Sequence, residues 1–233
     1  MPSAHADNCP MALKLVQCWD DGVTSDARLV EILRRRGAKA SFNLNAGLHE
    51  EERKPGWLHQ GTEVWRLGRN EMRAVYAGFT IANHSLTHPC LDRMDIAAAR
   101  RDIAQGRDEL QQFFGQPVAG FADPFGSYNE AVAMAVRDAG HVYARTTVSA
   151  EPCFPTIDAV ALHPSCHFLA SDFWQRHEKA KHGCGVFYFW GHSYEMTSNA
   201  MWTAFESTLE RLGQDPDARW CDPADLFEGA ANE

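Results

Sequence analysis

The sequence lacks long apolar stretches and an excess of positive charge. No apolar run approaches the roughly 20 residues that a helix needs to cross a lipid bilayer. The 233 residues include 22 lysines and arginines against 31 aspartates and glutamates, a net charge of −9. Binding to nucleic acids by phosphate neutralisation requires a basic surface. We therefore expect neither a membrane nor a nucleic acid as a partner.

The pattern of a secretory leader is also missing, since the apolar run that follows Met11 is short and is broken by Lys14. The first ten or so residues are polar, and we expect them to be flexible. No repeat, low-complexity tract or linker interrupts the chain. Apolar residues make up 45% of it, enough for a sizeable core. We expect a single catalytic domain over residues 1–233.

Closely spaced cysteine pairs are absent as well. The chain has seven cysteines, an odd number, and no Cys-x-x-Cys motif. Zinc ribbons and thioredoxin-like redox sites use such pairs, so neither is indicated. We expect reduced thiols and a cytoplasmic protein. The seven are Cys9, Cys18, Cys90, Cys153, Cys166, Cys184 and Cys221.

Strand-like and helix-like segments alternate along the chain, which favours an α/β fold with a parallel sheet, open or closed into a barrel. Residues 46–68 are interrupted by proline and glycine, and we expect them to form a long irregular loop. We expect strands at 13–19, 40–45, 79–83, 118–122, 142–144, 159–163 and 186–190. We expect helices at 26–36, 69–77, 92–114 with Asp92 as its cap, from Ser127 or Asn129 to Gly140, at 172–181, and from Thr197 or Ser198 to Leu212.

Polar side chains follow nearly every expected strand. Because ligands bind at the carboxyl ends of strands in barrels and open α/β sheets, these residues are expected to share one site. In chain order they are Asp20, Asp21, Asn43, Asn45, His84, His88, Asp123, Arg145, His163, Cys166, His167 and His192.

Two adjacent carboxylates, Asp20 and Asp21, follow the first expected strand. Like charges repel, so this arrangement at a strand end indicates a cation. By itself the stretch is better interpreted as a solvated turn before a helix.

His84 and His88 lie four residues apart, an offset that can place both imidazoles on one ion. By themselves they are better interpreted as two unrelated surface or core histidines. With an acidic pair at a neighbouring strand end, ligation becomes the better interpretation. One carboxylate and two histidines leave coordination positions open, as in catalytic metal sites.

These residues resemble the polysaccharide deacetylases of carbohydrate esterase family four. The matching segments, in the family's order, are Asp20-Asp21-Gly22, His84-Ser85-Leu86-Thr87-His88, Pro124-Phe125-Gly126 and His192. The resemblance implies a distorted (β/α)7 barrel and a divalent metal, usually Zn²⁺, with Co²⁺ or Ni²⁺ as alternatives. It also implies hydrolysis of an N-acetyl or related acyl group on an amino sugar or glycan.

The resemblance also implies a role for each matching residue. Asp21, His84 and His88 would hold the metal, with Asp20 as general base and His192 as general acid. The backbone N–H of Phe125 would stabilise the oxyanion. The substrate-binding residues would be Pro124, Phe125, Gly126 and Asn45.

Two departures from the family pattern stand out. Ala122 occupies the position of an arginine that orients the base, and Arg145 at the next strand end is a candidate replacement, although a surface salt bridge is as good an interpretation of it. The family's Asp-Trp motif has no match, so the group that orients His192 is left open. His163 and His167 are interpreted as loop histidines.

Tryptophans offer surfaces on which sugar rings can stack. Trp57 and Trp65, in the expected long loop, are the better candidates, whereas Trp190 in a strand is expected to pack in the core, as is Trp19. Two other functions fit the same fold: a cyclic amide or ureide hydrolase, and a carbohydrate-binding barrel without activity. The sequence does not identify the saccharide, the acyl group or the oligomeric state.

Overall fold

The computed structural model describes residues 12–151 and 158–227. The polar N-terminal residues expected to be flexible lie outside the described residues, as do Cys9 and Cys153. The cysteines within these ranges are all free thiols. Across the same ranges, no helix combines the length and apolar character needed to traverse a bilayer.

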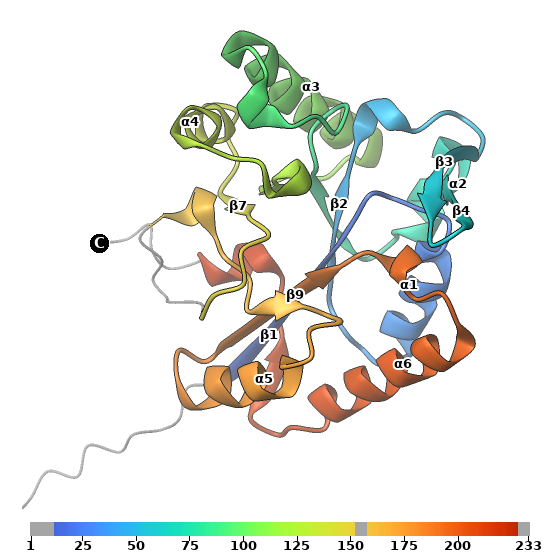
Figure 1. The fold of residues 1–233 in the computed structure, drawn as a ribbon, viewed down its shortest axis with the longest axis vertical. Helices are drawn as coiled ribbons and strands as arrows, with labels where there is room; N and C mark the ends of the chain where they lie inside the picture. The colour runs from blue at the N-terminus through green and yellow to red at the C-terminus, as the bar shows by residue number, and fades with distance from the viewer. Residues whose placement is uncertain (1–11, 152–157, 228–233) are drawn as a thin grey trace, which may run out of the picture.

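One parallel sheet organises the structure. Its strands follow the order β7–β6–β5–β2–β1–β9–β8, and β10 pairs with the first half of β1. The sheet curls into a distorted (β/α)7 barrel, which confirms the predicted fold class (Figure 1). The strands are β1 (Leu13–Asp20), β2 (Ser41–Leu44), β5 (Thr80–Asn83), β6 (Gly120–Ala122), β7 (Tyr143–Arg145), β8 (Cys166–His167), β9 (Val186–Gly191) and β10 (Ala218–Trp220).

Six α-helices in the described ranges surround this sheet. Figure 1 shows α5 and α6 along one side of the molecule and α3 and α4 on the opposite side. Each buries one apolar face; in α6, for example, Trp202, Phe205, Leu209 and Leu212 recur at helical spacing and are buried. The helices are α1 (Asp26–Arg35), α2 (Arg69–Val75), α3 (Ile96–Phe114), α4 (Glu130–Asp138), α5 (Phe173–His182) and α6 (Asn199–Gly213).

Strand β1 is the central element. It pairs with β9 along most of its length and with β2 over its last three residues, so nearly all of its side chains are buried. A parallel strand covered on both faces reads as a nearly continuous apolar run, which is why the sequence identifies it. Trp19 packs in the core between Phe168 and Phe205, as predicted. Asp20 and Asp21 therefore emerge at the centre of the sheet's carboxyl edge.

The prediction that residues 46–68 form an irregular loop is wrong. They contain an antiparallel hairpin of β3 (Lys54–His59) and β4 (Thr62–Arg66). Gln60 and Gly61 both have positive φ, as a two-residue hairpin turn requires. The glycine that suggested a break is the turn itself. Backbone bonds attach β4 to the chain beyond β1: Thr24 donates to Trp65, and Leu67 donates to Gly22.

The strand predicted at 159–163 is also wrong. The side chain of Asp158 accepts a hydrogen bond from the Val160 N–H at 3.0 Å and so caps a 3₁₀ turn over Ala159–Ala161. Only an isolated bridge joins Leu162 to Arg145. The strand at this place in the fold is the two-residue β8, and the short β10 has no expected counterpart in the sequence.

Helix α3 begins later than predicted. Asp95, not Asp92, is its cap and accepts hydrogen bonds from the N–H groups of Ala97 and Ala98, both at 3.1 Å. Asp92 instead lies in a separate 3₁₀ turn and accepts the hydroxyl of Ser127. Helix α4 begins after Asn129, whose side chain accepts from the Val132 N–H at 3.0 Å.

Candidate active site

The carboxyl ends of the strands open into a cavity of about 580 Å³. Seven of the strand-end and motif residues that the sequence assigns to a site line it: Asp20, Asp21, His84, His88, Asp123, Phe125 and His192. Arg145 lies behind this surface, where it contacts Asp20 and the ring of Trp190. Asn45, Pro124 and Gly126 are not part of the cavity wall.

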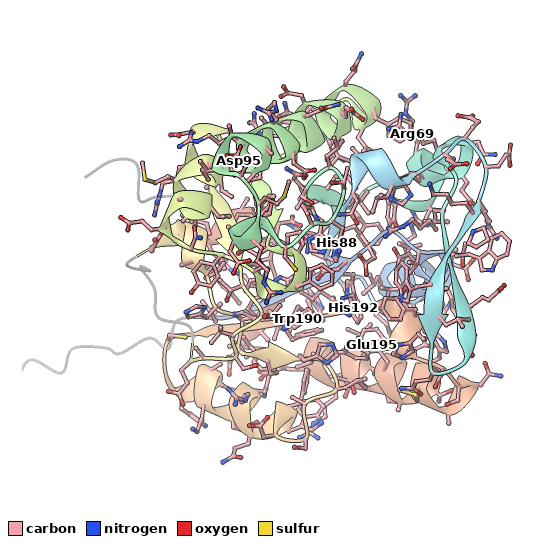
Figure 2. The ribbon with its side chains drawn as sticks, turned by 45° about the horizontal axis from the view of Figure 1, so that its top comes forward. Arg69, His88, Asp95, Trp190, His192 and Glu195 are labelled. Atoms are coloured by element: carbon pink, nitrogen blue, oxygen red, sulfur yellow. The ribbon has the colours of Figure 1, made fainter. Side chains whose placement is uncertain are left out.

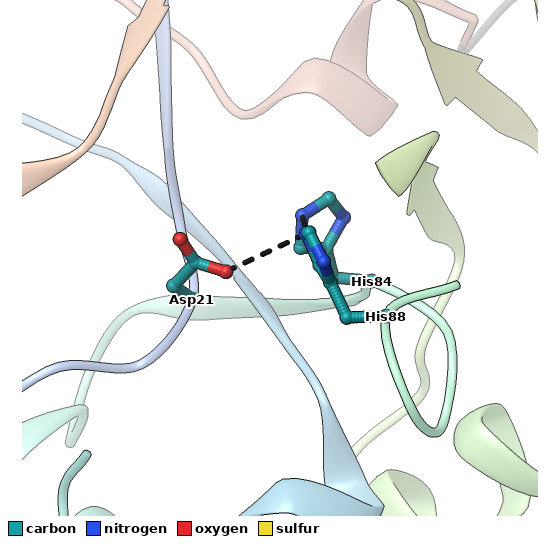
Figure 3. A group of neighbouring side chains, drawn as sticks. All are labelled: Asp21, His84 and His88. Carbon is teal, nitrogen blue, oxygen red and sulfur yellow. Dashed lines mark hydrogen bonds and ion pairs between the residues drawn. The ribbon is translucent and has the colours of Figure 1, made fainter. Parts of the chain in front are cut away.

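Asp21, His84 and His88 converge from two strand ends (Figure 3). One ligand atom from each lies within 4.8 Å of the others. Asp21 Oδ1 is 3.7 Å from His88 Nε2, and the two Nε2 atoms are 3.1 Å apart. The chain reverses sharply at each end of this group, since Asp21 and His88 have φ values of 83° and 56°. Such conformations are strained for side-chain-bearing residues and are concentrated at functional sites.

The protonation of these groups suits a metal ion. His84 Nδ1 lies 2.8 Å from the backbone oxygen of Ala122, which only accepts, so Nδ1 carries the proton and Nε2 presents its lone pair. Burial lowers the pKa of His84 and lowers that of His88 to about 4, which keeps both imidazoles neutral. Asp21 Oδ1 is buried with no hydrogen-bond partner. Two lone pairs and an unpaired carboxylate oxygen fit a divalent cation with N and O ligands.

Side chains outside the motif hold the histidine loop. Asp102 on α3 accepts hydrogen bonds from the Leu86 N–H at 2.8 Å and from the Thr87 hydroxyl at 2.6 Å. The buried Asn45 amide donates to the carbonyl of His84. The expectation that Asn45 binds substrate is therefore corrected: its side chain is committed to the loop. The sequence did not identify Asp102, because only the fold brings α3 beside this loop.

Asp20 is held separately from Asp21. Its Oδ1 accepts from the amide of Asn43 at 2.6 Å, and its Oδ2 accepts from the guanidinium of Arg145. Burial raises the pKa of this carboxyl, but Arg145, His84, His192 and the Asn43 hydrogen bond together outweigh it, and the pKa is lowered. Arg145 is only 1% exposed, so its interpretation as a surface salt bridge is wrong.

His192 follows β9 and faces both aspartates. Its Nε2 lies 3.9 Å from Asp20 Oδ2 and 3.9 Å from Asp21 Oδ2. On the other side of the ring, Nδ1 lies 3.2 Å from Glu195 Oε2 (Figure 2). Burial lowers the pKa of His192, but Glu195 and the two aspartates outweigh it and raise the pKa. The imidazole of His192 thus lies between the carboxylates of Asp20 and Asp21 and the carboxylate of Glu195.

Glu195 is the functional candidate that the sequence analysis missed. Its Oε2 also accepts from the His192 backbone N–H at 3.0 Å and lies 2.9 Å from His167 Nε2. Burial raises the pKa of Glu195, but these two histidines outweigh it and lower the pKa to about 2. The reading of His167 as a loop histidine is corrected, since it contacts this carboxylate. The sequence does contain a signal for Glu195, namely a carboxylate three residues after His192.

Aromatic side chains form much of the remaining cavity wall. Trp57 from the hairpin lines it, and its ring meets that of Tyr194 edge-on with centroids 5.2 Å apart. Trp190 packs against the core, as predicted, and it also lines the cavity. Trp65 lies outside the wall. Sugar rings bind through such surfaces because their C–H faces pack on aromatic rings.

Comparisons with known proteins agree with this geometry. A family model described as polysaccharide deacetylase matches residues 8–144, a region that includes Asp20, Asp21, His84 and His88 but not His192. This match confirms the resemblance that the sequence motifs predict. No curated protein matches the chain significantly.

Solved structures share the fold. The Streptococcus pyogenes deacetylase PplD in complex with acetate is 20% identical, with a TM-score of 0.53 over 63% of this chain and 61% of that chain. The Xyl-CE4 domain of a multidomain xylanase from the hindgut metagenome of Trinervitermes trinervoides is 17% identical, with a TM-score of 0.57 and coverage of 93% and 90%. A CE4 family pseudoenzyme from Bacillus anthracis is 15% identical, with a TM-score of 0.61 and coverage of 94% and 66%. At these identities the likeness establishes the fold alone.

Proposed function

Because the chain belongs to the polysaccharide deacetylase family, we propose that it is a metal-dependent hydrolase that removes an N-acetyl or related acyl group from an amino sugar or glycan. In this proposal Asp21, His84 and His88 hold one divalent cation, with Zn²⁺ as the best match to their N and O donors. Asp20 is the general base and His192 the general acid.

One observation carries the proposal: the two adjacent carboxylates have different partners. Asp21 has a buried, unpaired oxygen beside two imidazole nitrogens. Asp20 is bound by Asn43 and Arg145 instead, which holds its carboxylate apart from that cluster. A hydrolytic site needs this division between a group that binds the metal and a group that moves a proton.

The chain's own residues supply the remaining chemistry. A bound divalent cation contributes Lewis acidity toward the amide carbonyl and toward water. Asp20, kept ionised by Arg145, accepts a proton from the attacking water. His192, whose pKa is raised by Glu195 and the two aspartates, donates a proton to the departing amine. The N–H of Phe125, at the cavity wall, is the proposed donor to the oxyanion.

A carbohydrate-binding protein without activity is the main competing function, and a pseudoenzyme is among the similar structures. The absence of the family's arginine from position 122 is the sequence feature that favours a protein without activity. Arg145 now occupies the contact with Asp20 that such an arginine would make, which removes this support.

Metal content and acetate release test the proposal together. We expect purified protein to retain about one equivalent of zinc by elemental analysis and to release acetate from some member of a panel of N-acetylated and O-acetylated saccharides. Asp20→Asn should keep the metal and lose turnover, whereas His88→Ala should lose both. His182→Ala, an exposed histidine outside the cavity, is the control. An Asp20→Asn protein with the wild-type rate would overturn the assignment of the base.

A further inference from the structure

Arg66, at the end of β4, is a second guanidinium in the cavity wall. The residue is only 7% exposed. Its Nη1 donates a 2.8 Å hydrogen bond to the backbone oxygen of Asp21, and its Cζ lies 5.1 Å from the centre of the Trp57 ring. The charge of Asp21 favours the cation, but no carboxylate of the described residues forms an ion pair with it. Charged groups so deeply buried are normally paired.

Arg69, three residues further on, provides an internal comparison. It also donates to a backbone carbonyl, that of Ala46 at 2.9 Å, and its Cζ lies 5.6 Å from the ring centre of Phe113. Unlike Arg66, it has a carboxylate partner, Glu109, at 3.3 Å. Figure 2 shows Arg69 well away from His192. The two arginines make the same structural contacts, and the one that faces the cavity is the one without a counter-charge.

The charges around the cavity leave Arg66 unbalanced. Asp20 is neutralised by Arg145, and burial raises the pKa of Asp123 well above its usual range, which favours its uncharged form. Asp21 remains as the carboxylate that offsets Arg66, and in the proposed function its charge is shared with a divalent cation. The working cavity therefore carries surplus positive charge, although the chain as a whole is acidic.

We propose that the substrate is an N-acylated saccharide that carries a carboxylate, and that Arg66 binds this carboxylate. The inference rests on the proposed hydrolase function and deepens it. A planar guanidinium offers paired donors that match a carboxylate. Because Arg66 is bonded to the backbone of Asp21, the carboxylate belongs to the acylated sugar or to the sugar linked directly to it. Trp57 and Tyr194, on the same wall, provide the faces against which that sugar packs.

Two matched disaccharides test this inference by binding as well as by turnover. One is glucuronic acid linked to N-acetylglucosamine, and the other has glucose in place of the uronic acid. Calorimetry with zinc-loaded Asp20→Asn protein measures affinity without hydrolysis. We expect the uronate ligand to bind about tenfold or more tightly, with a preference that declines as salt increases. Arg66→Met in this background should reduce the preference to near unity, and Arg66→Lys should retain part of it.

Arg69→Met is the matched control, because it removes an arginine with the same structural contacts outside the cavity; it should keep the full preference. The inference is overturned if protein with Arg66 intact binds the two ligands equally tightly, or if it binds neither ligand. It is also overturned by an Arg66→Met variant that weakens both ligands by the same factor, since that result indicates a structural role. A retained uronate preference in a wild-type protein that releases no acetate would instead refute the hydrolase function alone.

Discussion

Arg145 lies directly beside Ala122 across the parallel β6–β7 ladder. Residues paired in this way point to the same face of a sheet, so a side chain from either position reaches the same space. The guanidinium of Arg145 uses that space to contact Asp20. Arg145 therefore reaches Asp20 from the strand next to position 122, and its role as a replacement for the family's arginine stays a prediction.

Arg145→Met should abolish most turnover and destabilise the protein. Removing one partner of a buried ion pair leaves Asp20 as an uncompensated charge, which typically costs about 3–5 kcal/mol in the free energy of unfolding. Urea unfolding and acetate release measure the two effects. The double variant Ala122→Arg with Arg145→Ala should recover part of both, because the two positions are neighbours. A double variant no better than Arg145→Met would contradict this geometry.

Asp102→Asn should weaken metal binding without touching a ligand. Asp102 holds the loop between His84 and His88 through a backbone N–H and a hydroxyl. Substitution of residues that orient metal ligands commonly reduces affinity about 10- to 100-fold. Competition with a chelator of known zinc affinity measures the change, and exposed Asp108→Asn on the same helix is the control. Unchanged zinc affinity would show that the loop holds its shape without this contact.

Glu195→Gln should reduce kcat more than it raises KM. The carboxylate lies 3.2 Å from His192 Nδ1, the ring nitrogen that does not face the aspartates, so its loss should perturb the acid rather than the substrate site. We expect a decrease in kcat of about 10- to 100-fold. Glu178→Gln, which removes an exposed glutamate that also contacts a histidine, should have little effect. A change confined to KM would mean that Glu195 does not act through His192.

Because of Asp26, the free energy of unfolding should decrease as the pH rises from about 4 to about 7. Burial raises the pKa of Asp26 to about 7, well above the usual value for an aspartate, although Ser193, Tyr76 and Val23 all donate to it. Between these values the folded state binds more protons than the unfolded state, so the free energy of unfolding decreases with pH.

The matched variant for this effect is Asp26→Asn. Histidine titrations are common to both proteins, so the difference between their unfolding free energies isolates Asp26. We expect that difference to change by a few kcal/mol between pH 4 and pH 7 and to stay constant outside this window. Parallel stability curves across the window would contradict the raised pKa.

The sequence predicts groups that lie close together along the chain better than groups that only the fold assembles. Asp20 and Asp21 are adjacent, and His84 and His88 are four apart, so short motifs identify them. Asp102 reaches the histidine loop only because α3 packs beside it. The hairpin was missed for another reason. Gly61 forms its turn and Pro55 lies at an irregularity in β3, but glycine and proline also interrupt helices and strands elsewhere.

The hairpin's attachment has a practical consequence for engineering. Its base is joined to the chain after β1 by main-chain hydrogen bonds at Gly22 and Thr24, which do not depend on the side chains that the hairpin displays. Its tip at Gln60 and Gly61 is exposed. Libraries can therefore vary the inward-facing positions of the hairpin or lengthen its tip to change selectivity for the proposed glycan substrate. We expect Asp20 and Asp21 to keep their positions in such variants.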